Sequence, residues 1–162
     1  MIEQTLVLVK PDGVQRGLVG EVIKRFEQRG LKIVGLKLVK VEKDLAKKHY
    51  SDVAERRGES VFNSLMKYLN EGPVVAMVIQ GVNAVENVRK IVGPTESKSA
   101  TPGTIRGDFS HVSFSYADSK KIPVKNLIHA SGNKEEAQRE VSLWFSIDEL
   151  HDYKLSAESH LF

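Results

Sequence analysis

Four apolar runs rich in β-branched residues alternate with stretches of helical periodicity, and this alternation limits the folds that the chain can adopt. The runs lie at residues 5–9, 31–41, 73–79 and 124–129. The third run is apolar almost without interruption, which indicates burial on both faces or a central position in a sheet. The sequence therefore predicts four strands that share one core.

The helical patterns fall between these runs in a definite order. One helix follows the first run, a helical pair follows the second, and single helices follow the third and fourth. Asn83 with Glu86, and Asn133 with Glu136, are spaced as capping boxes at the starts of the last two helices. Without the pair, the order is βαββαβ. We therefore expect an α/β (α+β) fold, a ferredoxin-like sandwich with a four-stranded antiparallel sheet and an added helical pair.

Residues 94–123 are rich in Gly, Pro, Ser and Thr, and they predict a long loop. Loops of this length in compact domains are usually functional or disordered. The chain of 162 residues is of the size expected for one domain, so we expect residues 1–162 to form a single one.

Composition restricts the function classes further. The chain has no cysteine, which excludes disulfides and thiolate metal sites, and no apolar run is long enough to span a bilayer. No leader-like segment precedes the first strand, so we expect a cytoplasmic protein without membrane contact. The formal charge of +3 is compatible with phosphate-bearing ligands or nucleic acid. Binding of nucleic acid is thus the alternative function, on the same fold.

His129 stands at the end of the fourth apolar run and is followed by a small-residue turn that includes Ser131. A neutral imidazole is a nucleophile when one ring nitrogen is free and the other donates a hydrogen bond to a carboxylate. Glu140, on the following helix, is the candidate carboxylate. The alternative for Glu140 is a surface glutamate paired with a nearby cation, and spacing alone does not decide between them.

Three cations are spaced along the chain where they can bind a polyphosphate. Lys10 ends the first strand, Arg89 lies on the third helical stretch and Arg106 lies in the long loop. Lys10 can equally solvate the end of the strand, and Arg89 can equally be a solvated helix residue. The glycine-rich phosphate loops of other nucleotide-binding folds are absent from the sequence, so a nucleotide must be held in another way.

Six motifs, in order along nearly the whole chain, make the sequence resemble the nucleoside diphosphate kinase family. They are Lys10-Pro11-Asp12-Gly13, His49-Tyr50, and the segments 72–77, 102–109, 126–131 and 140–145. The resemblance implies a phosphotransferase that acts by ping-pong transfer. A nucleoside triphosphate, typically ATP, phosphorylates the histidine, and the phosphoryl group then passes to a nucleoside diphosphate. Mg²⁺ is implied as a cofactor that the nucleotide itself carries, with no metal ligand from the protein.

The resemblance also implies roles for individual residues. His129 is the phosphorylated nucleophile, Glu140 orients it and Ser131 supports that contact. The resemblance places the other site residues around the nucleotide: Lys10, Tyr50 and Asn126 at the γ-phosphate and sugar hydroxyl, and Arg89, Thr95 and Arg106 at the α- and β-phosphates. It further implies a homo-oligomer, usually a hexamer and sometimes a tetramer or dimer.

The chain departs from the family pattern at Gly132 and Asn133, which replace an Asp-Ser pair with little expected effect, and in two longer segments. The segment between Tyr50 and Phe62 is longer than usual and lacks the family's Pro-Phe-Phe run, whose first Phe stacks on the base. Register from Leu65 places Val61 there, with Leu65 beside it in the nucleotide site, whereas a shifted register places Phe62 there. About ten extra residues precede Asn126, around residues 113–121, and we expect them to affect subunit assembly.

Overall fold

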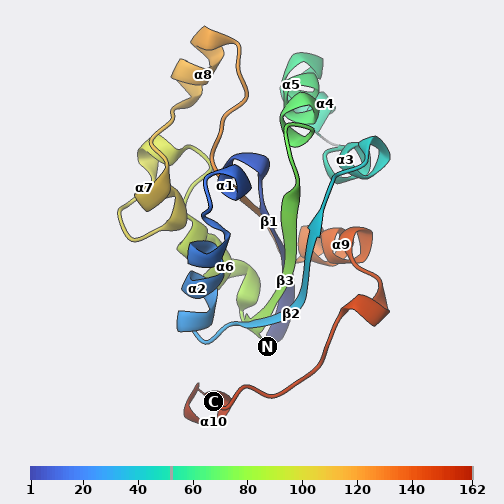
Figure 1. The fold of residues 1–162 in the computed structure, drawn as a ribbon, viewed down its shortest axis with the longest axis vertical. Helices are drawn as coiled ribbons and strands as arrows, with labels where there is room; N and C mark the ends of the chain where they lie inside the picture. The colour runs from blue at the N-terminus through green and yellow to red at the C-terminus, as the bar shows by residue number, and fades with distance from the viewer. Residues whose placement is uncertain (52, 162) are drawn as a thin grey trace.

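The centre of the protein is a four-stranded antiparallel sheet, described by a computed structural model that covers residues 1–51 and 53–161 (Figure 1). The strands lie side by side in the order β2-β3-β1-β4. They are β1 (Ile2–Val9), β2 (Lys32–Val39), β3 (Val74–Val82) and β4 (Ile128–Ala130). Each neighbouring pair is antiparallel. This is the ferredoxin-like sandwich that the sequence predicts.

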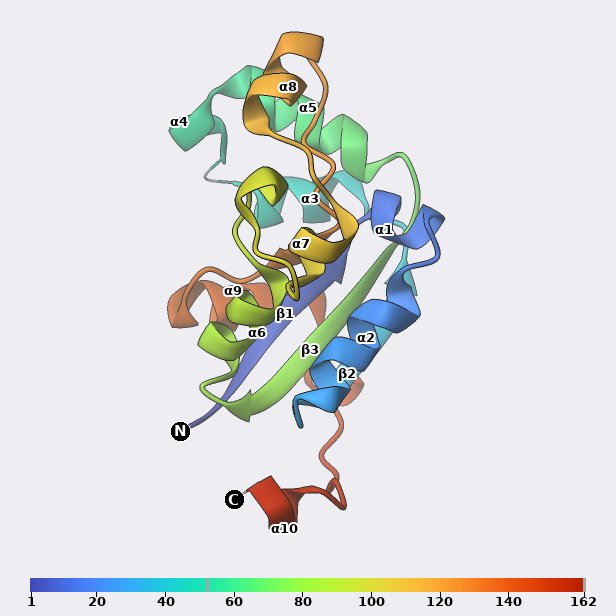
Figure 2. The same ribbon diagram turned by 90° about the vertical axis from the view of Figure 1, so that its left-hand side faces the viewer.

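Helices cover both faces of the sheet. α2 and α6 lie on one face and α9 on the other, while α3, α4, α5 and α8 stand at one end (Figure 2). The helices are α1 (Pro11–Gln15), α2 (Val19–Gln28), α3 (Lys43–His49), α4 (Val53–Arg57), α5 (Glu59–Leu69), α6 (Ala84–Val92), α7 (Ile105–Phe109), α8 (Phe114–Lys120), α9 (Lys134–Trp144) and α10 (Glu158–Leu161), with 3₁₀ turns η1 (Ser97–Ser99) and η2 (Ile147–Glu149). Within the described ranges, no helix combines the length and apolar character needed to cross a membrane.

The central strand β3 separates two apolar cores. Side chains with odd numbers, such as Met77, pack with Val22 and Phe26 of α2 and with Val88 of α6. Side chains with even numbers, such as Val78, pack with residues of α9 on the opposite face. Because successive side chains of a strand point to opposite faces, a strand buried on both sides must be continuously apolar. The prediction of burial and a central position for this run is confirmed.

β4 is shorter than the predicted strand at residues 124–129, because the backbone leaves the extended conformation just before it. Leu127 has a left-handed φ of 69°. Its carbonyl accepts a hydrogen bond from the amide of Lys10, and its own amide donates to the Asp12 carboxylate. This bend gives up strand pairing at residues 124–127, and it leaves the side chain of Asn126 buried beside Lys10.

Residues 94–123 are not a plain loop, since η1, α7 and α8 lie within them. Thr104 and Ser113 cap α7 and α8 with their hydroxyl groups, which explains how a segment rich in Ser and Thr forms short helices. The predicted helical pair is likewise three helices, α3, α4 and α5.

The two predicted capping boxes have different outcomes. Asn133 accepts a hydrogen bond from the amide of Glu136, so the cap of α9 is confirmed. Asn83 makes no side-chain cap, and that prediction is wrong. Its backbone is left-handed, and its amide donates instead to the carbonyl of Met1.

Candidate active site

A cleft of about 1050 Å³ opens at the end of the sheet where α3, α4, α5 and α8 stand. Its floor includes residues of β4 and its walls come from α3, α5, α6, α8 and α9. Every site residue predicted from the sequence lines this cleft except Ser131, which lies buried beneath it. The lining members are Lys10, Tyr50, Val61, Leu65, Arg89, Thr95, Arg106, Asn126, His129 and Glu140.

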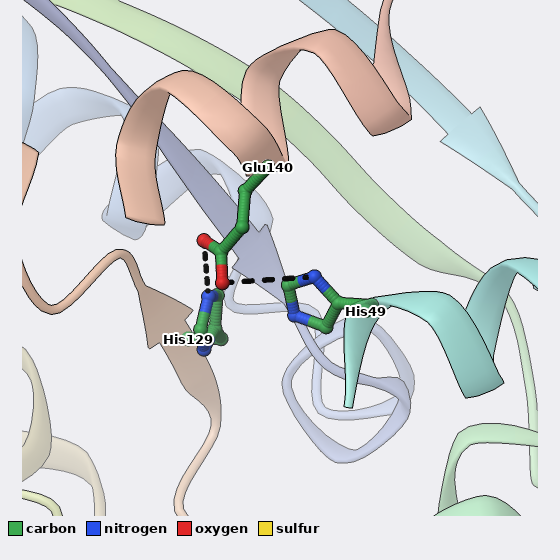
Figure 3. Close-up of side chains that lie close together, drawn as sticks. All are labelled: His49, His129 and Glu140. Atoms are coloured by element: carbon green, nitrogen blue, oxygen red, sulfur yellow. Dashed lines mark hydrogen bonds and ion pairs between the residues drawn. The ribbon is translucent and has the colours of Figure 1, made fainter. Parts of the chain in front are cut away.

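His129 and Glu140 meet across the gap between β4 and α9 (Figure 3). Nε2 of His129 lies 2.9 Å from Oε2 of Glu140. The hydroxyl of Ser131 donates to the same carboxylate oxygen at 2.7 Å and is itself fixed by the amide of Leu6. A carboxylate accepts hydrogen bonds, so Nε2 carries the proton and Nδ1 keeps its lone pair. The alternative of a surface ion pair for Glu140 is wrong, because this side chain is buried.

The electrostatics keep Glu140 ionised. Burial alone raises the pKa of the Glu140 carboxyl, but the hydrogen bond from His129 acts against it. The hydroxyl of Ser131 acts in the same direction as that bond. The net result is a pKa below the ordinary value, which suits a carboxylate that must stabilise positive charge on an imidazole.

Lys10, Asn126 and Thr95 form a chain of hydrogen bonds on the floor of the cleft. Nζ of Lys10 donates to Oδ1 of Asn126 at 2.6 Å, and the amide nitrogen of Asn126 donates to the carbonyl of Thr95 at 2.7 Å. Burial, and secondarily the charge of Arg106, lower the pKa of Lys10 to about 7. An anion bound beside Lys10 would relieve both effects, so this ammonium group is poised for a phosphate.

Arg106 is held by three backbone carbonyls. Its Nε, Nη1 and Nη2 donate to the carbonyls of Asn126, Gly93 and Ile128 at 3.3, 2.9 and 2.5 Å. Burial, and then the neighbouring charge of Arg89, lower the pKa of its guanidinium to about 10, so it stays charged. A guanidinium has five N–H groups, so two remain to bind a ligand in the cleft.

The outer part of the cleft is lined by two segments that each contribute apolar side chains among polar ones. Val61 and Leu65 of α5 lie on one side, and the segment from Phe114 to Val124, which includes α8, lies on the other. Phe62 is not among the residues that line it. The extra residues at 113–121, which the sequence relates only to assembly, thus contribute directly to this wall.

His49 is the functional candidate that sequence reasoning missed. The sequence shows it only as one of several scattered histidines, and as part of the His49-Tyr50 motif. In the structure its ring lies edge to face with that of His129, with centroids 4.6 Å apart. One ring nitrogen of His49, one ring nitrogen of His129 and one carboxylate oxygen of Glu140 all lie within 4.8 Å of one another, a spacing that could hold a metal ion. No local signal in the sequence pointed to it, because its partner Trp144, whose indole nitrogen donates to Nδ1 of His49, lies far away in the chain.

Comparisons with known proteins agree on one family. The model of the nucleoside diphosphate kinase family matches residues 3–150. A nucleoside diphosphate kinase of Borreliella burgdorferi is 49% identical over 160 residues, which cover 98% of this chain and 96% of that protein. One of Pyrococcus abyssi is 51% identical over 151 residues, covering 93% and 89%.

Solved structures give the same result. A nucleoside diphosphate kinase from Borrelia burgdorferi, described as a transition-state mimic with bound vanadate and ADP, superposes with a TM-score of 0.95. The two chains are 48% identical, and the match covers 98% of this chain and 96% of that one.

Proposed function

Because this chain belongs to the nucleoside diphosphate kinase family of phosphotransferases, we propose that Nδ1 of His129 is the atom that carries the phosphoryl group between nucleotides. The hydrogen bond from Nε2 to Glu140 supports this assignment, because it leaves the Nδ1 lone pair free on the side of the cleft.

The proposed transfer has two matched halves. The Nδ1 lone pair bonds to the γ-phosphorus of a nucleoside triphosphate, the bond from phosphorus to the β–γ bridging oxygen breaks, and the diphosphate leaves with the bonding electrons. The ring becomes positively charged, and the buried Glu140 carboxylate stabilises that charge without taking the proton. A second nucleoside diphosphate then takes the phosphoryl group by the reverse of these steps.

The phosphate chain is proposed to lie along the cations of the cleft floor. Lys10 and Tyr50 are proposed to contact the γ-phosphate, and Asn126 the sugar hydroxyl. Arg106, Arg89 and Thr95 are proposed for the α- and β-phosphates. The two uncommitted N–H groups of Arg106 and the lowered pKa of Lys10 support this placement.

Mg²⁺ is proposed to enter with the nucleotide. Mg²⁺ prefers oxygen ligands, which the phosphates supply. The candidate group in the protein, His49, His129 and Glu140, offers instead two nitrogens and one carboxylate that is already hydrogen-bonded. When bound, the ion neutralises charge on the phosphates, and the residues named above orient the same phosphates.

The base is proposed to lie in the outer cleft, against Val61 and Leu65. Val61 lines the cleft with 43% of its surface exposed, which supports the register that aligns it with the family's stacking aromatic. An aliphatic wall binds any base through apolar contact and does not read its edge, so broad base specificity is expected.

The exposed edge of the sheet supports the proposal that the protein is a homo-oligomer. β2 is an edge strand, and its Leu36 and Leu38 are 53% and 63% exposed. The C-terminal segment lies along the first half of this strand, with the amide of His151 donating to the carbonyl of Val34, and its Glu149 pairs with Lys37, while Leu36 and Leu38 in the second half remain exposed. A second copy that pairs there would bury both leucines. A hexamer, tetramer or dimer, a cytoplasmic location and a single domain over residues 1–162 complete the proposal.

The test is transfer of label through the protein. Brief exposure to γ-³²P-labelled ATP and Mg²⁺ should give an acid-labile, alkali-stable phosphoprotein, and added GDP should remove the label as GTP. His129→Ala should take up no label, whereas His111→Ala, at an exposed histidine, should behave as the wild type. Labelling that persists in His129→Ala contradicts the proposal. Salt-sensitive binding of single-stranded DNA by unlabelled protein would support the nucleic-acid alternative.

A further inference from the structure

His49 is a buried histidine whose tautomer the structure determines. Only 2% of its surface is exposed. Nε1 of Trp144 lies 3.1 Å from its Nδ1. An indole N–H only donates, so Nδ1 of His49 accepts and the ring proton is on Nε2. Burial, and secondarily the charge of His129, lower the pKa of His49 to about 3, so the ring is neutral.

A second contact at Nδ1 does not alter this assignment. Oε1 of Glu140 lies 3.7 Å from the same nitrogen, which is an ion pair only if His49 is protonated. Protonation of Nδ1 would place its hydrogen against the indole N–H of Trp144. The distance to Glu140 is also too long for a hydrogen bond. We therefore take Trp144 as the partner of Nδ1.

The opposite nitrogen is a donor without an acceptor. Nε2 of His49 is buried and has no hydrogen-bond partner among the residues that the structure describes. Buried N–H groups are nearly always paired, and an orphaned one at a ligand site points to a partner that arrives with the ligand. The hydroxyl of Tyr50 is a second buried orphan, and its ring contacts His49 with centroids 4.4 Å apart. Both residues line the cleft.

The position of His49 indicates which part of the ligand it meets. Its ring is nearly perpendicular to that of His129, at 80°, and Figure 3 shows the edge that bears Nε2 facing the His129 ring. Because Glu140 occupies Nε2 of His129, an incoming phosphoryl group must bond to Nδ1. The oxygens of that phosphoryl group are the hydrogen-bond acceptors that the reaction brings close to Nε2 of His49.

We propose that Nε2–H of His49 donates a hydrogen bond to a non-bridging oxygen of the phosphoryl group while it moves between the nucleotide and Nδ1 of His129. The inference rests on the proposed role of His129. No proton is transferred, because the lone pair of the His49 ring is held at Nδ1 by Trp144. The bond is absent in the free enzyme and forms only with the phosphoryl group, so it lowers the barrier and does not strengthen the binding of a nucleoside diphosphate.

Neutrality of His49 matters for turnover. A cationic donor beside phosphohistidine would stabilise the intermediate strongly and slow the second half-reaction. A neutral donor stabilises both directions of transfer in a similar way. His49 therefore has the role of a catalytic residue, and Trp144 that of a positioning residue that fixes its tautomer.

Two amide substitutions at His49 distinguish loss of its hydrogen-bond donor from loss of its packing. In His49→Gln the amide nitrogen can take the place of Nε2, and in His49→Asn the amide oxygen can take the place of Nδ1, so only the first keeps the donor. We expect His49→Asn to slow single-turnover phosphorylation by γ-³²P-labelled ATP roughly 100-fold, the usual effect of removing one such donor. We expect His49→Gln to keep the rate within about tenfold of the wild type. The dissociation constant of ADP should change less than about twofold in both, as for an interaction made only during transfer.

Three outcomes overturn the inference. One is a wild-type rate of phosphorylation in His49→Asn, and another is an equal loss in both variants at unchanged thermal unfolding temperature. The third is a parallel loss of ADP affinity, since this indicates a structural role.

Wild-type protein labelled with ¹⁵N-histidine provides an answer even if the variants do not fold. The Nε2–H resonance of His49 should move downfield on phosphorylation of His129, and an unmoved resonance overturns the proposal. Failure of the wild type to take up label contradicts the function of His129 itself, and is thereby distinguished from failure of the His49 inference alone.

Discussion

The two ends of the cleft are built differently. At the inner end, Lys10, Arg106 and Asn126 are each less than one tenth exposed, and each is held by one or more hydrogen bonds. At the outer end, Val61 and Ile122 are 43% and 44% exposed, and they present apolar surface without polar partners of their own. At the inner end, Lys10 directly follows β1, Asn126 lies just before β4 and Arg106 lies on α7, whereas the outer end is formed by α5 and by the segment that contains and follows α8.

This contrast separates chemistry from recognition. Groups that act on a developing charge must be fixed before the reaction, because reorganising them costs free energy at the transition state. The outer surface, which is proposed to contact the base, needs no such precision. Substitutions should therefore have large effects on turnover at the inner end and small effects, mainly on KM, at the outer end.

Glu140→Gln tests the inner end where the largest effect is expected. Gln keeps the size of the side chain and its acceptor oxygen but removes the charge that is proposed to stabilise the His129 imidazolium. We expect kcat/KM to fall roughly 10³-fold, by analogy with loss of the orienting carboxylate in other imidazole sites. Steady-state assays with ATP and GDP measure this. Glu135→Gln, at an exposed position of the same helix, is the matched control. A loss below about tenfold would remove the distinction between the two ends.

Arg106→Lys tests whether the inner end depends on geometry as well as on charge. Lysine keeps the charge but cannot donate to the carbonyls of Gly93, Asn126 and Ile128 while also reaching a phosphate. We expect kcat/KM to fall about 100-fold, with a lower unfolding temperature. Arg16→Lys, at an exposed arginine, serves as the control for the substitution itself. Unchanged activity in Arg106→Lys would mean that charge alone suffices.

Lys10 gives the inner end a pH signature. Its folded pKa of about 7 lies below the ordinary value of 10.5. Between these two values the unfolded chain binds more protons, so the contribution of Lys10 to the unfolding free energy rises with pH and is constant below pH 7. Urea titrations across this window should show the difference between wild type and Lys10→Met increasing with pH. A difference that does not vary with pH contradicts the assignment.

Binding of ADP should also reveal the lowered pKa of Lys10, through uptake of a proton. Phosphate favours the charged ammonium, so the complex should take up a proton near pH 8.5, and calorimetry in buffers of different ionisation enthalpy measures it. Lys10→Met should abolish that uptake. Its persistence in the variant would assign the proton elsewhere.

The outer end should show the smallest effects. Val61→Ala and Ile122→Ala each remove part of a half-exposed apolar contact. We expect KM for nucleoside diphosphates to rise only about two- to fivefold, with kcat unchanged, because little apolar area is lost. Lys120→Ala, on α8 but outside the cleft lining, is the control. A fall in kcat comparable to that of the inner-end variants would break the comparison.

Much of the inner end was predictable because it is tied to local pattern. The strand that ends at Lys10, the turn after His129 and the cap at Asn133 are each encoded within a few residues. The succession of strands and helices along the chain followed from the apolar and helical patterns. The contact between His129 and Glu140 was foreseen as a possibility, and it required α9 to pack on β1, which only the tertiary structure decides.

The other features of the site could not be predicted from the sequence, because they depend on contacts between segments that are distant in the chain. Leu127 has a left-handed backbone that is held by hydrogen bonds with Lys10 and Asp12. The residues around position 127 contain no pattern that predicts this conformation. The position of α8 across the cleft from α5 is likewise a matter of packing. His49 gains its meaning from Trp144, 95 residues away in the chain.

The central claim is that Glu140 holds Nε2 of His129 and leaves Nδ1 to react. The most direct test is to identify the phosphorylated nitrogen, by ³¹P and ¹⁵N NMR of ¹⁵N-histidine-labelled enzyme after treatment with ATP and Mg²⁺. Coupling of phosphorus to Nδ1 of His129, with the proton retained on Nε2, is the predicted result. Phosphate on Nε2, or on another residue, would contradict the account.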